Sequence, residues 1–111
     1  MTRWIDVTAL ADIPSRGSRV VALPMGPVAV FRTGDDQVFA LLDRCPHKGG
    51  PLSQGIVHGH AVTCPLHNWT IEFATGAARA PDHGCTPRFE VRIVDERVHI
   101  AVAQSLAEAA E

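Results

Sequence analysis

The chain has 111 residues, of which 46% are apolar and 20% charged, and its formal net charge is -2. This length corresponds to one domain with its own core. A near-neutral charge without a basic run argues against nucleic acid as a partner, and no apolar stretch approaches the roughly 20 residues that span a bilayer, which argues against a membrane. The N-terminus lacks a basic region followed by an apolar run, so we expect a cytoplasmic protein with reduced thiols.

Short β-prone runs separated by Gly, Pro and Asp turns follow one another along the chain. One helical turn is expected over 8–13, and a frayed tail with a capping box at 105–108. Near the C-terminus, residues 89, 91 and 93 and residues 98, 100 and 102 are apolar at every second position and should face the core. The predicted strands are 19–23, 28–32, 38–43, 56–58, 61–64, 69–73, 89–94 and 97–102. This spacing predicts an all-β fold, a small antiparallel sandwich or barrel.

The middle of the chain differs in composition from the rest. Residues 45–85 contain all three cysteines and five of the six histidines. We therefore expect a β base formed by 1–44 and 86–103, an inserted metal-binding subdomain over 45–85, and a tail over 104–111.

Two boxes in this inserted region pair one cysteine with one histidine each. Cys45 and His47 form a C-x-H box, and Cys64 and His67 form a C-x2-H box, with 16 residues between the two. A [2Fe-2S] cluster that places two thiolates on one iron and two imidazoles on the other would use this set completely. Zinc is the alternative, although its structural Cys2His2 sites usually pair like with like, and an apo fold is a third possibility.

The residues beside the four ligands fit loops that close over a cluster. Proline after each cysteine fixes φ and removes an N–H donor, and glycine lets backbone pass close to sulfur. Lys48 is expected to be a solvated loop residue, and Trp69 is expected to shield the cluster or fill the core. These flanking residues are Pro46, Lys48, Gly49, Pro65, Leu66 and Trp69.

The remaining candidate side chains have less specific surroundings. Cys85 has no paired cysteine and is expected to be a buried free thiol. His58 and His60 flank Gly59 at a hairpin tip and should face solvent, as should His99 on the last strand. His83 lies in a turn and is expected to face water, with a position covering the cluster as the alternative. No Ser/His/Asp set, paired carboxylates or phosphate-binding glycine loop is present, so no catalytic residue is predicted.

The two boxes resemble the Rieske [2Fe-2S] motif. The wider strings RCPHKGGPLSQGIV and CPLHNW, followed by Asp82 to Pro87, resemble the small subunit of assimilatory NAD(P)H-dependent nitrite reductase. That resemblance implies an electron-transfer subunit of an oxidoreductase that reduces nitrite to ammonium in nitrate assimilation. Its partner would be a large subunit holding FAD, the NAD(P)H site, a [4Fe-4S] cluster and sirohaem.

Two alternatives stay open beside this interpretation. The first is a stand-alone Rieske ferredoxin feeding a ring-hydroxylating oxygenase; such ferredoxins typically continue the second box with Gly and an aromatic residue, where this chain has Asn68 and Trp69. The second is a zinc-bound or apo interaction module. High-potential Rieske proteins carry an extra cysteine where this chain has Gly50 and Leu66, so we expect a low potential. A terminal oxygenase subunit is excluded because a chain of 111 residues leaves no room for a second domain with a mononuclear iron site.

Overall fold

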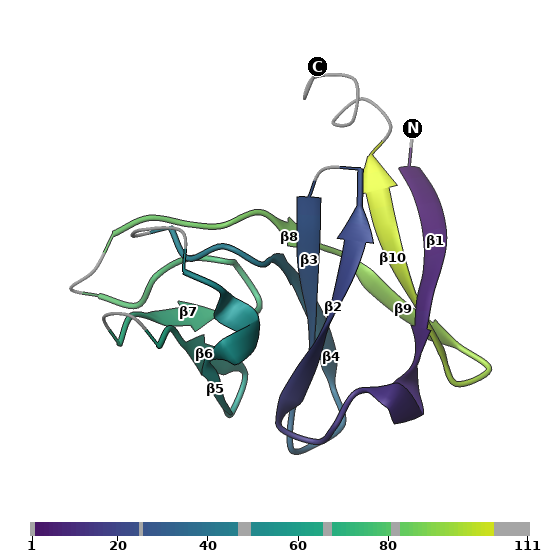
Figure 1. The fold of residues 1–111 in the computed structure, drawn as a ribbon, viewed down its shortest axis with the longest axis horizontal. Coiled ribbons are helices and arrows are strands. Elements are labelled where there is room, and N and C mark those ends of the chain that lie inside the picture. The colour runs from purple at the N-terminus through teal and green to yellow at the C-terminus, as the bar shows by residue number, and fades with distance from the viewer. Residues whose placement is uncertain (1, 25, 47–49, 66–67, 81–82, 104–111) are drawn as a thin grey trace.

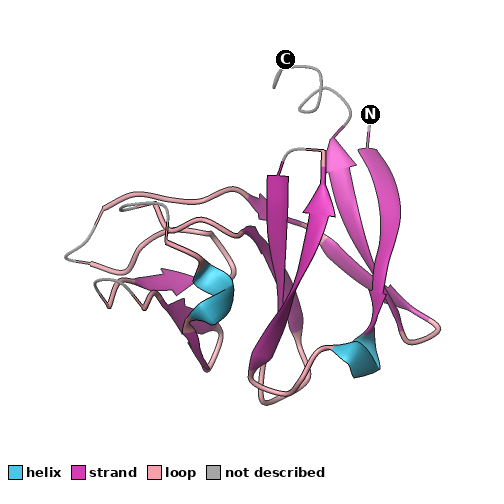
Figure 2. Cartoon of the chain, in the orientation of Figure 1, coloured by secondary structure: helices cyan, strands magenta, loops and turns pink. Residues whose placement is uncertain are grey.

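Three antiparallel sheets make up the computed structural model, which describes residues 2–24, 26–46, 50–65, 68–80 and 83–103 (Figures 1 and 2). In spatial order, the first sheet consists of β1 (Thr2–Ala9), β10 (Arg97–Ala103) and β9 (Val91–Val94). The second consists of β2 (Gly17–Leu23), β3 (Gly26–Arg32), β4 (Val38–Leu42) and β8 (Arg88–Phe89). The third consists of β5 (Ile56–His58), β6 (Ala61–Thr63) and β7 (Thr70–Glu72). Two short 3-10 turns, η1 (Leu10–Asp12) and η2 (Leu52–Gln54), precede β2 and β5.

The all-β prediction is confirmed, because no α-helix occurs among the residues that the structure describes. None of the helical turns in this part of the chain is long and apolar enough to cross a membrane. Each predicted strand has a counterpart, and the turn expected over 8–13 is narrowed to η1. The predicted tail over 104–111 lies outside the described residues.

The sequence interpretation missed one strand and merged two others. β1 pairs with β10 from Thr2 opposite Ala103 to Ala9 opposite Arg97, with a shift of register between Asp6 and Thr8. The predicted strand over 89–94 is divided at Glu90, because the chain leaves β4 as its partner and joins β10. Val91 still packs against the same core as Phe89, whereas Ile93, predicted to face the core, is 42% exposed on the edge strand β9.

The central strand β3 is buried on both faces, and this double burial creates two cores. Val28 and Val30 point toward the first sheet, whereas Ala29 and Phe31 point toward the third, as the period of two along a strand requires. The first core adds residues of β4, β8 and β10. The second core adds Leu41, η2 and the third sheet, and it contains the cysteines of both predicted boxes.

Three phenylalanines join the second sheet to the third. The ring of Phe73, just beyond β7, lies 4.7 Å from that of Phe31 on β3 and 5.2 Å from that of Phe39 on β4. Phe73 is 1% exposed, so its ring fills the space between the two sheets. The third sheet is thereby fixed against the second through apolar contact.

A polar contact next to these rings links the same two sheets, because the His60 ring lies 5.3 Å from that of Phe39. The imidazole Nε2 of His60 lies 3.0 Å from a carboxylate oxygen of Asp35, which sits in the turn between β3 and β4. The hydrogen bond from the Thr33 hydroxyl lowers the pKa of Asp35, and the hydrogen bond from His60 lowers it further. Both bonds favour the ionised carboxylate.

Acid titration should reveal this contact. A folded-state pKa below the unfolded value means that Asp35 stabilises the fold at pH values above the ordinary carboxyl pKa of about 3.9. This stabilisation is lost as the pH falls through the folded-state pKa of Asp35. The Asp35→Asn variant should therefore be less stable than wild type at neutral pH, with the difference vanishing in acid. Urea unfolding across a pH series measures it, with Asp12→Asn as the control for loss of one exposed charge. The same stability difference between wild type and Asp35→Asn at all pH values would contradict the assignment.

Candidate metal centre

Cys45 and Cys64 bring two thiols from different sheets into one apolar core. Cys45 follows β4 and is 2% exposed, whereas Cys64 directly follows β6 and is 1% exposed. Both belong to the cluster that includes Leu41 and Phe73, and the structure has neither in a disulfide. Buried thiols in such surroundings suit a soft metal or cluster from which water is excluded.

The first box lies in a loop closed on itself. The backbone N–H of Cys45 donates to the carbonyl of Gly50 at 2.8 Å, so the two ends of this loop are joined by a hydrogen bond. Pro46, next to the cysteine, is half-buried. The predicted ligand His47 and its neighbours Lys48 and Gly49 lie outside the described residues.

The second box is closed in a similar way. The N–H of Cys64 donates to the carbonyl of Trp69 at 2.7 Å, and the N–H of Asn68 donates back to the carbonyl of Cys64 at 3.1 Å. Trp69 is half-buried and packs against the core, while Pro65 is exposed. The predicted ligand His67, with Leu66, lies outside the described residues.

Asn68 completes this turn in the left-handed region, with φ of 59°. Glycine adopts this conformation at no steric cost, and asparagine is among the few other residues that do so readily. We expect Asn68→Gly to stay within about 0.5 kcal/mol of wild type and Asn68→Ala to lose about 1 kcal/mol of unfolding free energy, because alanine brings a Cβ without a compensating local hydrogen bond. Urea unfolding of the two variants side by side checks this; equal stability would contradict it.

A third loop, around Gly84, contacts both ligand loops, and these contacts were not predicted from the sequence. Gly84 has φ of 127°, and a Cβ built on it would lie 3.2 Å from Cβ of Pro46 and 3.9 Å from Cζ3 of Trp69. The carbonyl of Gly84 accepts the N–H of Ala78 at 2.8 Å, which fixes the loop beside the third sheet. The only signal in the sequence is a glycine in a Pro-Asp-His-Gly turn, which does not reveal what the turn touches.

Two predictions about other side chains are wrong. Cys85 is exposed rather than buried, because it lies in an isolated bridge to Ala77 and not within a sheet. His99 is only 21% exposed rather than at the surface, because β10 is the middle strand of the first sheet and its outward face lies between neighbours. Asp6 and Arg92 are its partners in register, and His99 Nε2 lies 3.7 Å from an Asp6 carboxylate oxygen.

The surface positions predicted for the other histidines are confirmed. His58, His60 and His83 are all exposed, and Gly59 between the first two has φ of 56° at the hairpin tip. His58 also contacts the Thr63 hydroxyl at 2.7 Å.

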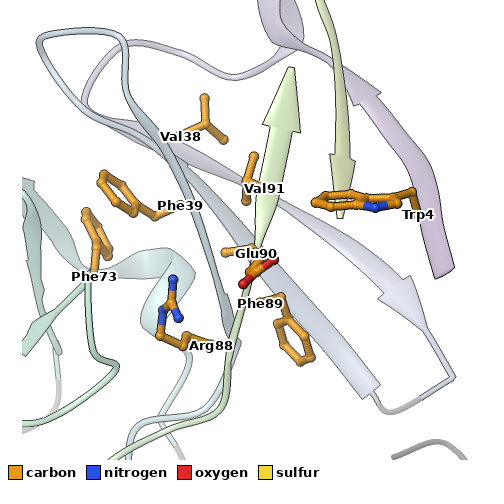
Figure 3. A pocket seen from close by; sticks show the side chains of 9 residues that line it. Trp4, Val38, Phe39, Phe73, Arg88, Phe89, Glu90 and Val91 are labelled. Carbon is orange, nitrogen blue, oxygen red and sulfur yellow. The ribbon is translucent and has the colours of Figure 1, made fainter. Parts of the chain in front are cut away.

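A cavity of about 320 Å³ lies between the first and second sheets (Figure 3). Its walls include Trp4, Phe39, Arg88 and Glu90, and Figure 3 shows the Trp4 ring across the opening from the Phe39 side chain. Of the two predicted ligands that the structure describes, neither Cys45 nor Cys64 is among the residues that line it.

The donor set fits an iron–sulfur cluster. Cys45 and Cys64 offer two buried thiols from two loops, and each loop also carries one histidine of the predicted set. Within the described ranges no group of three or more His, Cys, Asp and Glu side chains is placed to hold a metal ion, and the two predicted imidazoles fall outside those ranges. Two thiolates with two imidazoles are the complement that a Rieske centre requires.

Comparison with known proteins identifies the family. The Rieske [2Fe-2S] domain model matches residues 3–92. The ferredoxin subunit of anthranilate 1,2-dioxygenase from Burkholderia cepacia is 43% identical over 103 residues, which cover 92% of this chain and 94% of that protein. A chain in the complex of reduced oxygenase and oxidized ferredoxin of carbazole 1,9a-dioxygenase is 32% identical, with a TM-score of 0.78 and coverage of 88% and 92%.

The prediction of a nitrite reductase small subunit is wrong, and so is the classification of the chain as part of that enzyme. A Mycobacterium tuberculosis chain assigned as an NADH-dependent nitrite reductase small subunit superposes with a TM-score of 0.83, over 93% of this chain and 97% of that one, but at 23% identity. Such a match shows the fold alone, and the large subunit predicted as partner is not confirmed. The prediction depended partly on Asn68 in place of glycine, yet with φ of 59° Asn68 takes the conformation that glycine would.

The family match, the two closed loops and the buried thiols agree: the chain belongs to the Rieske [2Fe-2S] domain family and carries a cluster of that type.

Proposed function

We propose that this chain is a Rieske ferredoxin that delivers single electrons to the oxygenase component of an aromatic-ring-hydroxylating dioxygenase system. The observation that carries this proposal is the 43% identity to a dioxygenase ferredoxin subunit over nearly the full length of both proteins. The similarity to a ferredoxin found in complex with its oxygenase supports it. A cytoplasmic location stays a prediction.

We propose Cys45 and Cys64 as the thiolate ligands of one iron, and His47 and His67 as the imidazole ligands of the other. Bound there, the cluster supplies reversible one-electron transfer. The described residues bury the cysteine side of the site and fix the positions of the two cysteines. The apolar core excludes water from the cysteine side, and the closure of each loop fixes the cysteine backbone.

We further propose that residues 45–85 form the cluster-binding subdomain and that 1–44 and 86–103 form the base. The third sheet and both ligand loops lie within the first range, and the other two sheets lie within the second. The contact of Gly84 with Pro46 and Trp69 supports including the third loop in the subdomain.

Reconstitution of a dioxygenase system tests the proposed function. The reduced chain would be mixed with the oxygenase component of anthranilate 1,2-dioxygenase, oxygen and anthranilate, and its reoxidation followed by visible absorbance. We expect reoxidation coupled to product formation, and neither from the Cys64→Ser variant. Lack of reoxidation by this oxygenase and by that of carbazole 1,9a-dioxygenase, from a chain that holds its cluster, would contradict the proposal.

A further inference from the structure

Asp43 uses both oxygens of its carboxylate on one residue. It follows β4 directly, and Ser53 lies in η2. The Ser53 N–H donates to Oδ1 of Asp43 at 2.7 Å, and the Ser53 hydroxyl donates to Oδ2 at 2.8 Å. Hydrogen bonds to an ionised carboxylate are roughly twice as strong as neutral ones, and the paired arrangement fixes orientation as well as distance.

Both partners are themselves held by the second sheet. The N–H of Asp43 donates to the carbonyl of Pro27 on β3 at 2.9 Å. The carbonyl of Ser53 accepts the hydroxyl of Ser18 on β2 at 2.8 Å. The pair therefore connects η2 to the body of the second sheet.

The segment between Asp43 and Ser53 contains the whole first ligand loop. The two residues are ten positions apart, and inside this span the N–H of Cys45 is bonded to the carbonyl of Gly50. The inner bond closes the loop on itself, whereas the outer pair fixes where the closed loop sits. Without the outer pair, the position of Gly50 and the residues after it would depend on the buried side chain of Leu52 and on the hydrogen bond from the Ser18 hydroxyl to the Ser53 carbonyl.

We infer that Asp43 is a positioning residue for the first ligand loop, acting through Ser53 to hold Cys45 at the position that the cluster needs. This inference rests on the ligand assignment proposed above and does not depend on the redox partner. Outer partners that orient ligands typically contribute 10- to 100-fold in metal affinity.

Three variants separate positioning from charge. Asp43→Ala removes both acceptors. Asp43→Asn keeps an oxygen for the Ser53 N–H and an amide for the hydroxyl, but loses the charge. Ser53→Ala removes only the hydroxyl bond. Asp12→Ala, at an exposed residue of η1, is the control for loss of one negative charge.

Iron release to a ferrous chelator and the EPR line shape of the reduced protein are the measurements. We expect about tenfold faster release from Asp43→Ala, with shifted or broadened g-values, a smaller increase from Ser53→Ala, and release within about twofold of wild type from Asp43→Asn and Asp12→Ala.

Release at the wild-type rate from Asp43→Ala would overturn the inference, as would Asp43→Asn releasing iron as fast as Asp43→Ala. If Asp43→Ala does not fold, Ser53→Ala and Asp43→Asn decide the outcome: both at the wild-type rate would overturn the inference. A Cys64→Ser variant with a wild-type spectrum would instead refute the ligand assignment.

Discussion

Replacing Cys64 with serine should yield a folded chain that holds less than about a tenth of the wild-type iron, since a ligand contributes more than the 10- to 100-fold of an outer partner. The Cys64 side chain is 1% exposed in the core between the second and third sheets. Serine offers a hydroxyl of high pKa in place of a soft thiolate, and the core admits no water to replace the lost ligand. Iron content per chain and visible absorbance measure the loss.

Cys85→Ser is the matched control for this prediction. Its thiol is exposed and belongs to none of the three sheets, so the variant should keep iron and spectrum. Equal iron content in the two serine variants would remove Cys64 from the ligand set. A loss confined to Cys85→Ser would place a ligand in the third loop instead.

Phe73→Ala should lower the free energy of unfolding by about 3–5 kcal/mol, the usual cost of deleting a buried aromatic side chain. The Phe73 ring lies 4.7 Å from that of Phe31 and 5.2 Å from that of Phe39, and it is 1% exposed. A cavity at this position would loosen the third sheet against the second. Since Cys45 follows a strand of the second sheet and Cys64 a strand of the third, the variant should also release iron faster.

Phe89→Ala separates the two effects. Phe89 is also buried, at 7% exposure, but it belongs to the core between the first and second sheets. Its replacement should cost a similar free energy of unfolding and leave the rate of iron release in the folded state near that of wild type. Urea unfolding and chelator kinetics on both variants make the comparison. A Phe73→Ala variant that unfolds like wild type would contradict this view of the interface.

Strand positions were predictable where one segment keeps a single partner. Val98, Ile100 and Val102 alternate with half-buried residues along β10 and are buried as expected. The strand over 89–94 was not predictable as two, because the change of partner at Glu90 depends on where β4 and β10 lie. The prediction that His99 lies at the surface failed for a similar reason. Alternation along one strand shows that a side chain points outward, but it does not show whether neighbouring strands flank that side chain.

The ligand boxes could be proposed from spacing, whereas the contacts around them could not. Cys–His pairs within one to two residues of each other are a local signal. The bond between Asp43 and Ser53 spans ten residues, and the contact of Gly84 with Pro46 joins segments far apart in the chain. The choice between related families failed at Asn68, where one residue type substitutes for another in the same left-handed conformation.

Nitrogen hyperfine coupling in the EPR spectrum of the dithionite-reduced chain tests the ligand assignment most directly. The spectrum would be recorded at cryogenic temperature with histidine at natural abundance and again with histidine labelled with 15N. We predict an average g-value below that of the free electron and couplings to two imidazole nitrogens, from His47 and His67, that change on labelling. A reduced cluster without histidine nitrogen coupling, or an iron-loaded sample with no signal, would contradict the account.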